Sequence, residues 1–240
     1  MSTKKKKVLS LFLALVMVFS LLPGAGLAAK SSTSADTPLY RIVHLDCGRK
    51  YFSVANIEKL IDTMAQYGYN QLQLAFGNGG CRFLLDDMSL SFEDSSNETV
   101  EMISDTVKAN ITNGNNSFNR DTRYLTEAQM DDIIAYATAK DIDIVPMLNM
   151  PGHATAIVHD TSYASDGNLD VASEIARNYG YALLGKYVEY FKGKGCKFFH
   201  FGSDESGYTG PNMTTFLTGC ANYGDISGRK EVGGIAGQME

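Results

Sequence analysis

The chain has 240 residues, of which 44% are hydrophobic and 20% charged, and it carries a formal net charge of −6. This length and apolar content are enough for one sizeable hydrophobic core. The acidic balance argues against nucleic acid as a partner, because nucleic-acid-binding surfaces are basic. The four cysteines are widely spaced and form no Cys-x-x-Cys pair, so the sequence supports neither a zinc site nor a redox motif. We expect no metal and no cofactor.

The first 28 residues have the pattern of a secretory signal peptide. Four lysines precede an apolar run from Val8 to Leu22, and small residues lead to a cleavage site expected after Ala28. An uncleaved membrane anchor is disfavoured, because the apolar run is shorter than the roughly 20 residues that span a bilayer. We therefore expect a secreted or cell-surface protein that makes no membrane contact after cleavage.

Three segments are expected along the chain: a signal peptide at residues 1–28, a flexible lead-in at 29–38, and a single domain at 39–240. Removal of the signal peptide takes away four lysines and no acidic residue. The remaining 17 basic and 27 acidic residues give a net charge of −10.

Hydrophobic periodicity predicts that strands and helices alternate through this domain. We expect four strands, at residues 40–46, 69–77, 141–150 and 196–202. We expect three long helices between them, at residues 53–68, 126–140 and 171–192. The segment 78–121 is rich in Gly, Asn, Ser and acidic residues, and it predicts a long, partly irregular excursion with a short helix near residues 100–109.

Two of the predicted helices have recognisable ends. Ser53 is a candidate N-cap, and Gly68 supplies a stop. Thr126 and Gln129 have the spacing of a capping box. The apolar residues of each helix fall on one face and predict its buried side: Val54, Ile57, Leu60, Ile61 and Met64 in the first, Met130, Ile133, Ile134 and Ala137 in the second, and Ile175, Tyr179, Leu183, Tyr187 and Phe191 in the third.

Alternating strands and helices are typical of a parallel sheet with crossover helices. In such folds the active site lies beyond the carboxyl ends of the strands. Polar side chains occupy these ends in all four predicted strands, and we expect them to share one rim: Asp46 and Arg49, then Asn78, then Asn149 and His153, and finally His200, Asp204 and Glu205.

Asp204 and Glu205 are adjacent carboxylates, a pair that resists burial. A solvated turn before Gly207 is the plain interpretation. Neighbouring residues on a strand point to opposite sides, so the two are badly placed to flank a glycosidic bond as most carboxylate pairs do. They suit a reaction in which the 2-acetamido group of the substrate itself attacks the anomeric carbon.

In that reaction Asp204 would orient the acetamide and stabilise the oxazolinium ion that forms. Glu205 would protonate the leaving oxygen and then act as a base toward water. This role requires the Glu205 pKa to be raised toward neutrality by burial and by its anionic neighbour.

Several motifs resemble those of glycoside hydrolase family 20, the β-N-acetylhexosaminidases. His-Phe-Gly-Ser-Asp-Glu at residues 200–205 resembles the family's His-x-Gly-x-Asp-Glu. Residues 40–52 resemble its Arg-Gly-x-x-Leu-Asp-x-x-Arg pattern, and residues 146–153 resemble Pro-Glu-x-Asp-x-Pro-Gly-His. Residues 77–90 are similar to the subgroup of bacterial surface exo-β-N-acetylglucosaminidases and lacto-N-biosidases. The matches follow the family's order and spacing.

The resemblance implies a (β/α)8 TIM-barrel catalytic domain, and a glycan with a terminal β-linked N-acetylhexosamine as the substrate. It implies that Asp204 and Glu205 are the catalytic pair of a retaining, substrate-assisted hydrolase. By the same resemblance Arg41 would bind hydroxyls of the terminal sugar, and His153 and His200 would line or support the site.

Three positions depart from the family pattern. Met147 and Asn149 stand where the family often carries Glu and Asp, and Gly79 stands where the subgroup usually has Asp. Asn149 can still form hydrogen bonds to the substrate but brings no charge.

Plainer interpretations are open for several of these residues. His153 could merely cap a helix directly after it, and His200, between two phenylalanines, could be a core histidine. The six-residue spacing of His153 and His159 suits no zinc site. Asp86 and Asp87 fit loop structure better than catalysis.

The chain is shorter than a whole barrel requires. A TIM barrel has eight strand–helix units in about 250 residues, whereas residues 39–240 provide about four. The end after Phe216 is rich in glycine and shows no convincing helix period, and the chain has no Trp. We therefore expect a partial TIM barrel, truncated after about four units. Two alternatives to a hexosaminidase stay open: a lacto-N-biosidase that releases a disaccharide, and an inactive or carbohydrate-binding fragment.

Overall fold

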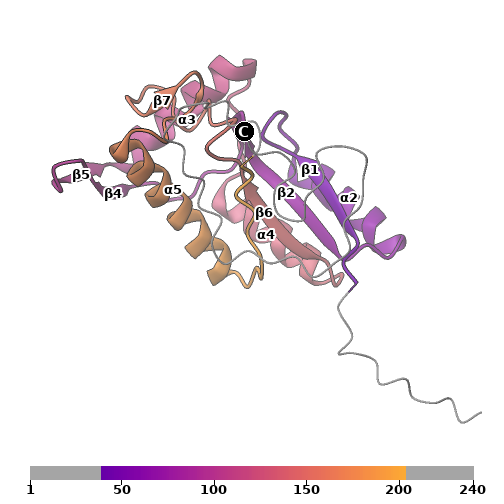
Figure 1. Ribbon diagram of the computed structural model, residues 1–240. Helices are drawn as coiled ribbons and strands as arrows, with labels where there is room; N and C mark the ends of the chain where they lie inside the picture. Colours follow the sequence, from indigo (N-terminus) through magenta and orange to yellow (C-terminus); the bar gives the residue numbers. More distant parts are fainter. Residues whose placement is uncertain (1–38, 204–240) are drawn as a thin grey trace, which may run out of the picture. The chain divides into compact units, whose positions relative to one another are not determined.

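The computed structural model describes residues 39–203 (Figure 1). The chain divides into two units, residues 1–39 and 40–240, and all the described helices and strands belong to the second. The predicted signal peptide, the lead-in, Asp204 and Glu205 lie outside the described residues.

A parallel sheet is the centre of the fold, as the alternation of elements predicts. Strand β1 (Ile42–Asp46) pairs in parallel with β2 (Gln71–Asn78), and β2 pairs in parallel with β6 (Asp143–Leu148). The short strand β3 (Gly80–Cys81) turns back antiparallel on the end of β2. A parallel bridge between Met147 and His200 places the last described segment beside β6.

This fourth position is a single bridge rather than the strand predicted at residues 196–202. His200 donates its backbone N–H to the Pro146 carbonyl, and its own carbonyl accepts from Leu148. The segment nevertheless follows β6 in the parallel direction. The carboxyl ends of all four chain segments therefore lie at one edge of the sheet.

Side chains alternate between the two faces of this sheet. Leu45 and Leu74 pair in register on the face beneath the helices, where Leu74 belongs to the hydrophobic core and Leu45 packs against it, whereas His44 and Gln73 pair on the other face. The His44 Nδ1 and Gln73 Oε1 atoms lie 2.8 Å apart. On this second face Ile42 is 52% exposed.

Two neighbouring helices cover the opposite face (Figure 1). Helix α2 (Val54–Gln66) buries Ile57, Ile61 and Met64, and the chain turns at Gly68 with φ +73°. Ser53 is its N-cap residue but makes no side-chain capping bond. Helix α4 (Glu127–Thr138) has the predicted capping box between Thr126 and Gln129. The four α4 side chains predicted to be buried are buried: Met130, Ile133, Ile134 and Ala137.

Helix α5 (Glu174–Gly193) adds an aromatic layer to the core. Its predicted stripe is buried from Tyr179 to Phe191, while Ile175 is only partly buried. The Phe191 ring lies 5.6 Å from that of Phe76 on β2 and 5.9 Å from that of Phe199. These ring contacts fix the last described segment against the sheet, because each aromatic pair adds to simple area burial.

The excursion between β2 and α4 is more regular than its composition predicts. It contains the hairpin of β4 (Leu90–Glu93) and β5 (Thr99–Met102), and then helix α3 (Ser104–Asn119). The prediction of a short helix near residues 100–109 is wrong in its bounds, because α3 begins later and runs ten residues further. A hydrophobic face in α3 consists of Val107 and Ile111 alone, so periodicity could not reveal its length.

The loop after β6 holds no helix next to His153, so a helix-capping role for this residue is wrong. His153 has a φ of 51°, and its backbone N–H donates to Asn168 Oδ1 at 3.1 Å. Asn168 lies in the small hairpin of β7 (Ala164–Ser165) and β8 (Asn168–Leu169).

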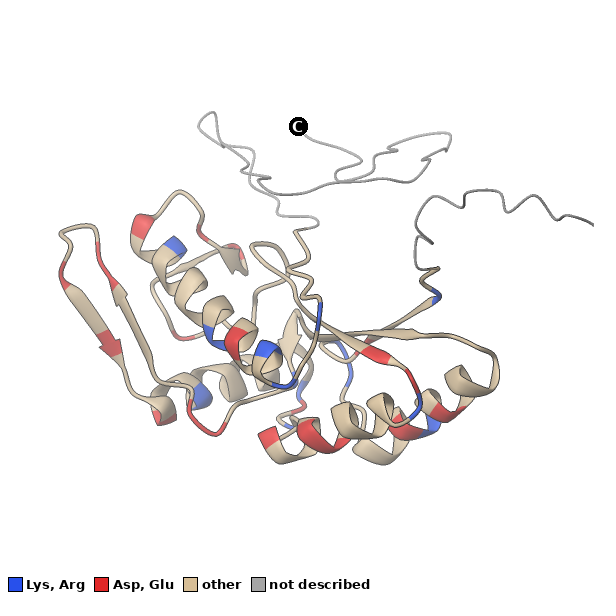
Figure 2. Cartoon of the chain, turned by 90° about the horizontal axis from the view of Figure 1, so that it is seen from below, with Lys and Arg blue, Asp and Glu red and all other residues tan. Residues whose placement is uncertain are grey.

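Three cysteines lie in the described part of the chain, and all are free thiols. Burial raises the pKa of Cys47 to about 12 and that of Cys81 to about 11. Both act as small hydrophobic residues in the core. Asp and Glu residues lie on the helices and on the β4–β5 hairpin, whereas Lys and Arg residues lie on helices but not on this hairpin (Figure 2). Within residues 39–203 we find no helix with the length and apolarity that a membrane crossing needs.

Candidate active site

The carboxyl edge of the sheet brings together polar side chains from all four segments. Asp46 ends β1, Asn78 ends β2, Asn149 directly follows β6, and His200 is in the bridge beside β6. This is the rim that the strand ends predict from the sequence. Because parallel strands place their carboxyl ends on one edge, residues that are far apart in the sequence meet there.

Three hydrogen bonds run along this rim from one strand end to the next. Asn78 donates through Nδ2 to Asp46 Oδ2 at 2.8 Å, and Asn149 donates through Nδ2 to Asn78 Oδ1 at 3.3 Å. The Ser203 backbone N–H donates to Asn149 Oδ1 at 2.9 Å. We call Asp46, Asn78, Asn149 and the Ser203 N–H the rim relay. It connects the first strand to the last described residue of the chain.

The loop after β1 places an arginine at one end of the rim relay, close to His153 from the loop after β6. The Arg49 backbone N–H donates to Asp46 Oδ1 at 3.1 Å, and Arg49 Nε lies 3.6 Å from Asp46 Oδ2. Arg49 Nη2 lies 3.4 Å from His153 Nδ1. Both Arg49 and Asp46 keep part of their side chains exposed, at 52% and 28%. The arrangement leaves a guanidinium and an imidazole at the rim, where they can meet a polar ligand.

Asn149 is 1% exposed, and its amide contacts protein groups on both sides. This side chain supports the rim, and its predicted role in substrate binding stays a prediction. Its backbone N–H also donates to the Gly77 carbonyl at 2.8 Å. Asn149 is therefore fixed to β2 by both backbone and side chain.

His200 and Gly202 shape the last turn before the end of the described chain. The Gly202 backbone N–H donates to His200 Nδ1 at 2.9 Å. A Cβ atom on Gly202 would lie 1.9 Å from Asn149 Oδ1, and Gly202 has φ +73°. Ser203 has a φ of 77°, which a non-glycine residue adopts only at a cost of order 1–3 kcal/mol. The position of Ser203 therefore depends on its bond to Asn149. His200 is exposed, so it is not the core histidine of the plain interpretation.

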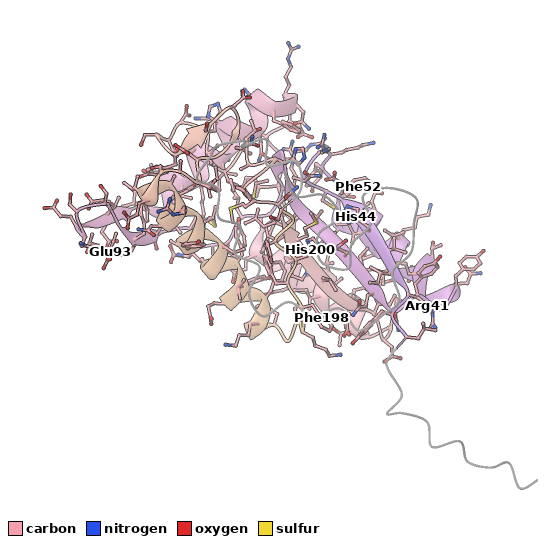
Figure 3. The ribbon with its side chains drawn as sticks, viewed as in Figure 1. Arg41, His44, Phe52, Glu93, Phe198 and His200 are labelled. Carbon is pink, nitrogen blue, oxygen red and sulfur yellow. The ribbon has the colours of Figure 1, made fainter. Side chains whose placement is uncertain are left out.

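Arg41 does not join this rim. It precedes β1 at the opposite end of that strand from Asp46, and Figure 3 shows it there, away from His200. Its Nε donates to the Gly68 carbonyl, and its backbone N–H donates to Asn70 Oδ1 at 2.7 Å. In this structure Arg41 closes the turn after α2.

Asp204 and Glu205, the predicted catalytic pair, lie outside the described residues. The described chain ends at Ser203, which the rim relay holds and which directly precedes Asp204 in the sequence. The predicted pair thus follows the rim without an intervening residue.

A buried arginine that the sequence analysis did not select supports the loop after β1. Arg82 is 0% exposed and donates from Nε to the Gly48 carbonyl at 3.3 Å. Its two terminal nitrogens donate to the Asp121 and Arg123 carbonyls and to Asn119 Oδ1. Asn119 in turn donates to the Arg49 carbonyl at 2.7 Å. The signal in the sequence is a lone arginine within the otherwise apolar run of residues 80–85.

The other residues weighed from the sequence take structural roles. Asp87 is bonded to Ser89 and pairs with Lys186 at 2.9 Å, and these hydrogen bonds lower its pKa. His159 lies 3.1 Å from Asp160. Within residues 39–203 no three His, Cys, Asp or Glu side chains are grouped to hold a metal ion.

A parallel α/β sheet with polar groups gathered at the carboxyl ends of its strands is the arrangement of the α/β enzymes. Comparison with known families makes this class specific. The model of the glycosyl hydrolase family 20 catalytic domain matches residues 39–209, so the chain belongs to this family. The matched range contains the rim, Arg41, Asp204 and Glu205.

Curated relatives of the chain are hexosaminidases. A beta-hexosaminidase of Vibrio vulnificus is 25% identical over 121 residues, which are 50% of this chain and 14% of that protein. A beta-hexosaminidase of Akkermansia muciniphila is 26% identical over 125 residues, which are 51% of this chain and 23% of that protein. The match thus spans less than a quarter of either relative.

Solved structures of the same family resemble this chain. The pneumococcal virulence factor StrH, an exo-beta-D-N-acetylglucosaminidase with tandem GH20 modules, is 34% identical with a TM-score of 0.62. The alignment covers 69% of this chain and 42% of that one. Dispersin B is 24% identical with a TM-score of 0.52, over 71% of this chain and 50% of that one, and supports the fold alone.

Proposed function

We propose that the protein is an exported, retaining exo-glycosidase that removes terminal β-linked N-acetylhexosamine from glycans. The observation that carries the proposal is the family match over residues 39–209, which includes both the rim and the Asp204–Glu205 pair. The names of the relatives support the substrate class, since they are hexosaminidases. Its export rests on the signal-peptide pattern of residues 1–28.

In the proposed reaction the acetamido oxygen of the substrate attacks C1 while Glu205 protonates the departing oxygen. The C1–O bond to the leaving group breaks, and a cyclic oxazolinium ion forms. Asp204 holds the acetamide N–H and stabilises the positive charge on that nitrogen. Glu205, now a carboxylate, then takes a proton from water as the water attacks C1 and the bond between C1 and the acetamido oxygen breaks, which restores the acetamide and the protonated Glu205 and retains the anomeric configuration.

The rim supports this chemistry by fixing the chain directly before the two acids. Proton transfer requires the acid within hydrogen-bond reach of the leaving oxygen. A displacement of about 1 Å can cost a factor of about 100 in rate, so the residue before Asp204 needs a fixed position. The hydrogen bond from Ser203 to the buried Asn149 provides a fixed attachment there.

We further propose that the described sheet is the first part of a (β/α)8 barrel whose remaining strands come from additional polypeptide. Two observations support this. The four parallel positions follow each other in chain order, as barrel strands do. Large apolar side chains are also partly exposed in the described sheet region, among them Ile42 at 52% and Phe198 at 46%. Further strands would cover this surface.

The test compares two aryl glycosides that differ only in the acetamido group. We expect hydrolysis of 4-nitrophenyl N-acetyl-β-glucosaminide and no measurable hydrolysis of 4-nitrophenyl β-glucoside, which has no internal nucleophile. The measurement is made on this chain and on a form extended beyond Glu240, if the gene continues. Equal cleavage of both glycosides contradicts the mechanism, and cleavage of neither by any form contradicts the function. Release of lacto-N-biose from its nitrophenyl glycoside instead would identify the disaccharide-releasing alternative.

Variants assign the two acids. Glu205→Gln should slow cleavage of a natural β-linked disaccharide by about a factor of 100 or more, and it should slow the nitrophenyl glycoside less, because that leaving group needs little protonation. Asp204→Asn should slow both substrates, since both form the oxazolinium ion. Asp132→Asn, which changes an exposed acid on α4, is the matched control and should leave both rates unchanged. Full activity in both site variants contradicts these assignments.

A further inference from the structure

We propose that the Asp46 carboxylate and the Ser203 N–H together fix the orientation of the two amides in the rim relay, and that Asp46, Asn78 and Asn149 act together as positioning residues for the chain before Asp204. The catalytic consequence rests on the proposed function. The hydrogen-bond arrangement of the relay is argued from the described residues alone and does not depend on that function.

The direction of the rim relay follows from its two ends. A backbone N–H can only donate, so Asn149 must present its Oδ1 atom to Ser203. The amide nitrogen of Asn149 then faces Asn78 and donates to it, which leaves the Asn78 nitrogen to donate to Asp46. An ionised carboxylate can only accept, so it fits this last position. Both ends therefore require the same orientation of the two amides between them.

Hydrogen bonds that run in one direction polarise one another, and an anionic acceptor strengthens the bond it receives. Asp46 is the one member of the four-part relay that carries a charge. It is itself held by the Arg49 backbone N–H at 3.1 Å. The negative charge that supports the rim thus lies at β1, while Asn149 is neutral beside the catalytic segment.

This arrangement explains why an amide suits position 149 in this chain. With a carboxylate at that position, two carboxylates would face the single amide of Asn78. The Asn78 NH2 group could donate to one of the two carboxylates. In either orientation of the amide, the Asn78 oxygen would then face the other carboxylate, and neither of these two groups carries a proton. One of the three contacts would lack a proton, at a cost typical of an unsatisfied polar group.

The same reasoning predicts a compensating pair of substitutions. In the parent chain one Asp46 oxygen accepts from the Arg49 backbone N–H and the other accepts from the Asn78 amide. In Asp46→Asn one of these two oxygens becomes an NH2 group, so one of the two donors faces another donor. In the double variant Asp46→Asn with Asn149→Asp, the Asn78 amide can turn over. The new amide then donates to Asn78, Asn78 donates to the new carboxylate, and this carboxylate accepts from Ser203, so all three contacts have a proton.

The primary measurement is the exchange rate of the Ser203 amide proton in protein labelled with ¹⁵N-serine, together with its chemical shift. Each single variant should exchange this proton about tenfold faster than the parent chain, because a relay contact without a proton loosens the side chain at position 149 that accepts from Ser203. The double variant should return to within about threefold of the parent rate, since the three hydrogen bonds of the rim relay are remade. The proposal is overturned if the two increases in Ser203 exchange rate add up in the double variant, or if neither single variant changes this rate.

Two further measurements separate this proposal from general loss of structure and from failure of the proposed function. Asp132→Asn on α4 and Asn56→Asp on α2 make the same chemical changes at exposed positions outside the relay and should not alter Ser203 exchange. If a single variant does not fold, the double variant must recover the parent circular dichroism spectrum, and its failure to do so overturns the proposal.

Hydrolysis of the N-acetylglucosaminide reports the catalytic consequence. The kcat should fall in each single variant and recover in the double variant in parallel with Ser203 protection. If no form of the chain cleaves the glycoside, the proposed function fails, but the exchange rates of Ser203 still show whether the hydrogen bonds of the rim relay depend on one another as proposed. If the parent is active and kcat does not follow Ser203 exchange, the positioning role fails although the function stands.

Discussion

At the scale of single residues, Gly202 allows the closest approach in the site. Its Cα packs against the Asn149 amide at a backbone conformation that L side chains rarely adopt. A methyl group there would displace the amide that holds Ser203. The requirement for glycine is therefore both conformational and steric.

We expect Gly202→Ala to lower the free energy of unfolding by about 1–2 kcal/mol from the left-handed backbone alone, with a further loss from displacement of Asn149. Gly185→Ala is the matched control, because a Cβ at this position in α5 meets nothing within 4 Å. The control should raise stability by about 0.5–1 kcal/mol. Urea unfolding measures both variants, and equal effects of the two would show that Gly202 is not constrained as described.

Residues at strand ends were predictable because the direction of a parallel strand determines where its end lies. Asn149, His153 and His200 were selected on that ground, and the structure places them at the carboxyl edge. Arg41 was selected by resemblance alone, and its position before β1 puts it at the other end of the strand. Arg82 was missed, because a buried cation bonded to carbonyls leaves no periodic pattern in a sequence.

At the scale of elements, α2 and α4 begin differently although both start after a residue with a hydroxyl group. Thr126 accepts a hydrogen bond from the Gln129 backbone N–H, and the Gln129 side chain bonds back to Thr126. Ser53 occupies the same position before α2 but makes no side-chain capping bond. The pair provides an internal comparison of a made and an unmade cap.

We expect Thr126→Ala to destabilise the protein by about 1 kcal/mol, since it leaves an N–H at the start of α4 without its partner. Ser53→Ala should cost clearly less, because no such bond exists to lose. Thermal unfolding of the two variants under identical conditions gives the comparison. A larger loss for Ser53→Ala would mean that the cap of α2 forms in solution and that of α4 does not.

The long helices were predictable because each has an apolar stripe and clear end signals. Those signals are absent where the prediction was wrong. Helix α3 buries Gly114 and Asn115 where a hydrophobic residue would mark the face. The sequence Phe-Phe-His-Phe at residues 198–201 predicts a fourth strand, but within it only His200 forms a bridge. Phe199 is instead held by its ring contact with Phe191. Local pattern could not show which of these contacts would form.

At the scale of the whole molecule, Arg82 joins segments that the sheet alone does not connect. It binds the loop after β1 through Gly48, the end of α3 through Asn119, and the connection to α4 through residues 121 and 123. Burial lowers the pKa of this guanidinium, and the nearby Asp121 opposes the shift. The cost of burying the charge is offset by hydrogen bonds to carbonyl groups that would otherwise be unsatisfied.

Replacement of Arg82 by Met should therefore do more than remove one side chain. It leaves the buried Gly48 carbonyl and the partly buried Asp121 and Arg123 carbonyls without this donor, and we expect a loss of about 3 kcal/mol or more in the free energy of unfolding. Arg82→Lys should recover little of it, because a single ammonium cannot reproduce the planar fork that reaches three segments. Lys192→Met, at an exposed position in the last turn of α5 with a 3.9 Å contact to Glu189, is the control and should have little effect.

The connecting role of Arg82 is tested by which residues gain hydrogen exchange when Arg82 is replaced. Hydrogen exchange in Arg82→Met should rise in residues 47–50 and 119–125, the segments that Arg82 joins, and to a smaller extent in α2 and α5. Because Asn119 also bonds to the Arg49 carbonyl, release of the α3 end should reach the Arg49 side of the rim. A uniform rise over residues 39–203 would mean that Arg82 contributes to global stability without holding these loops to each other.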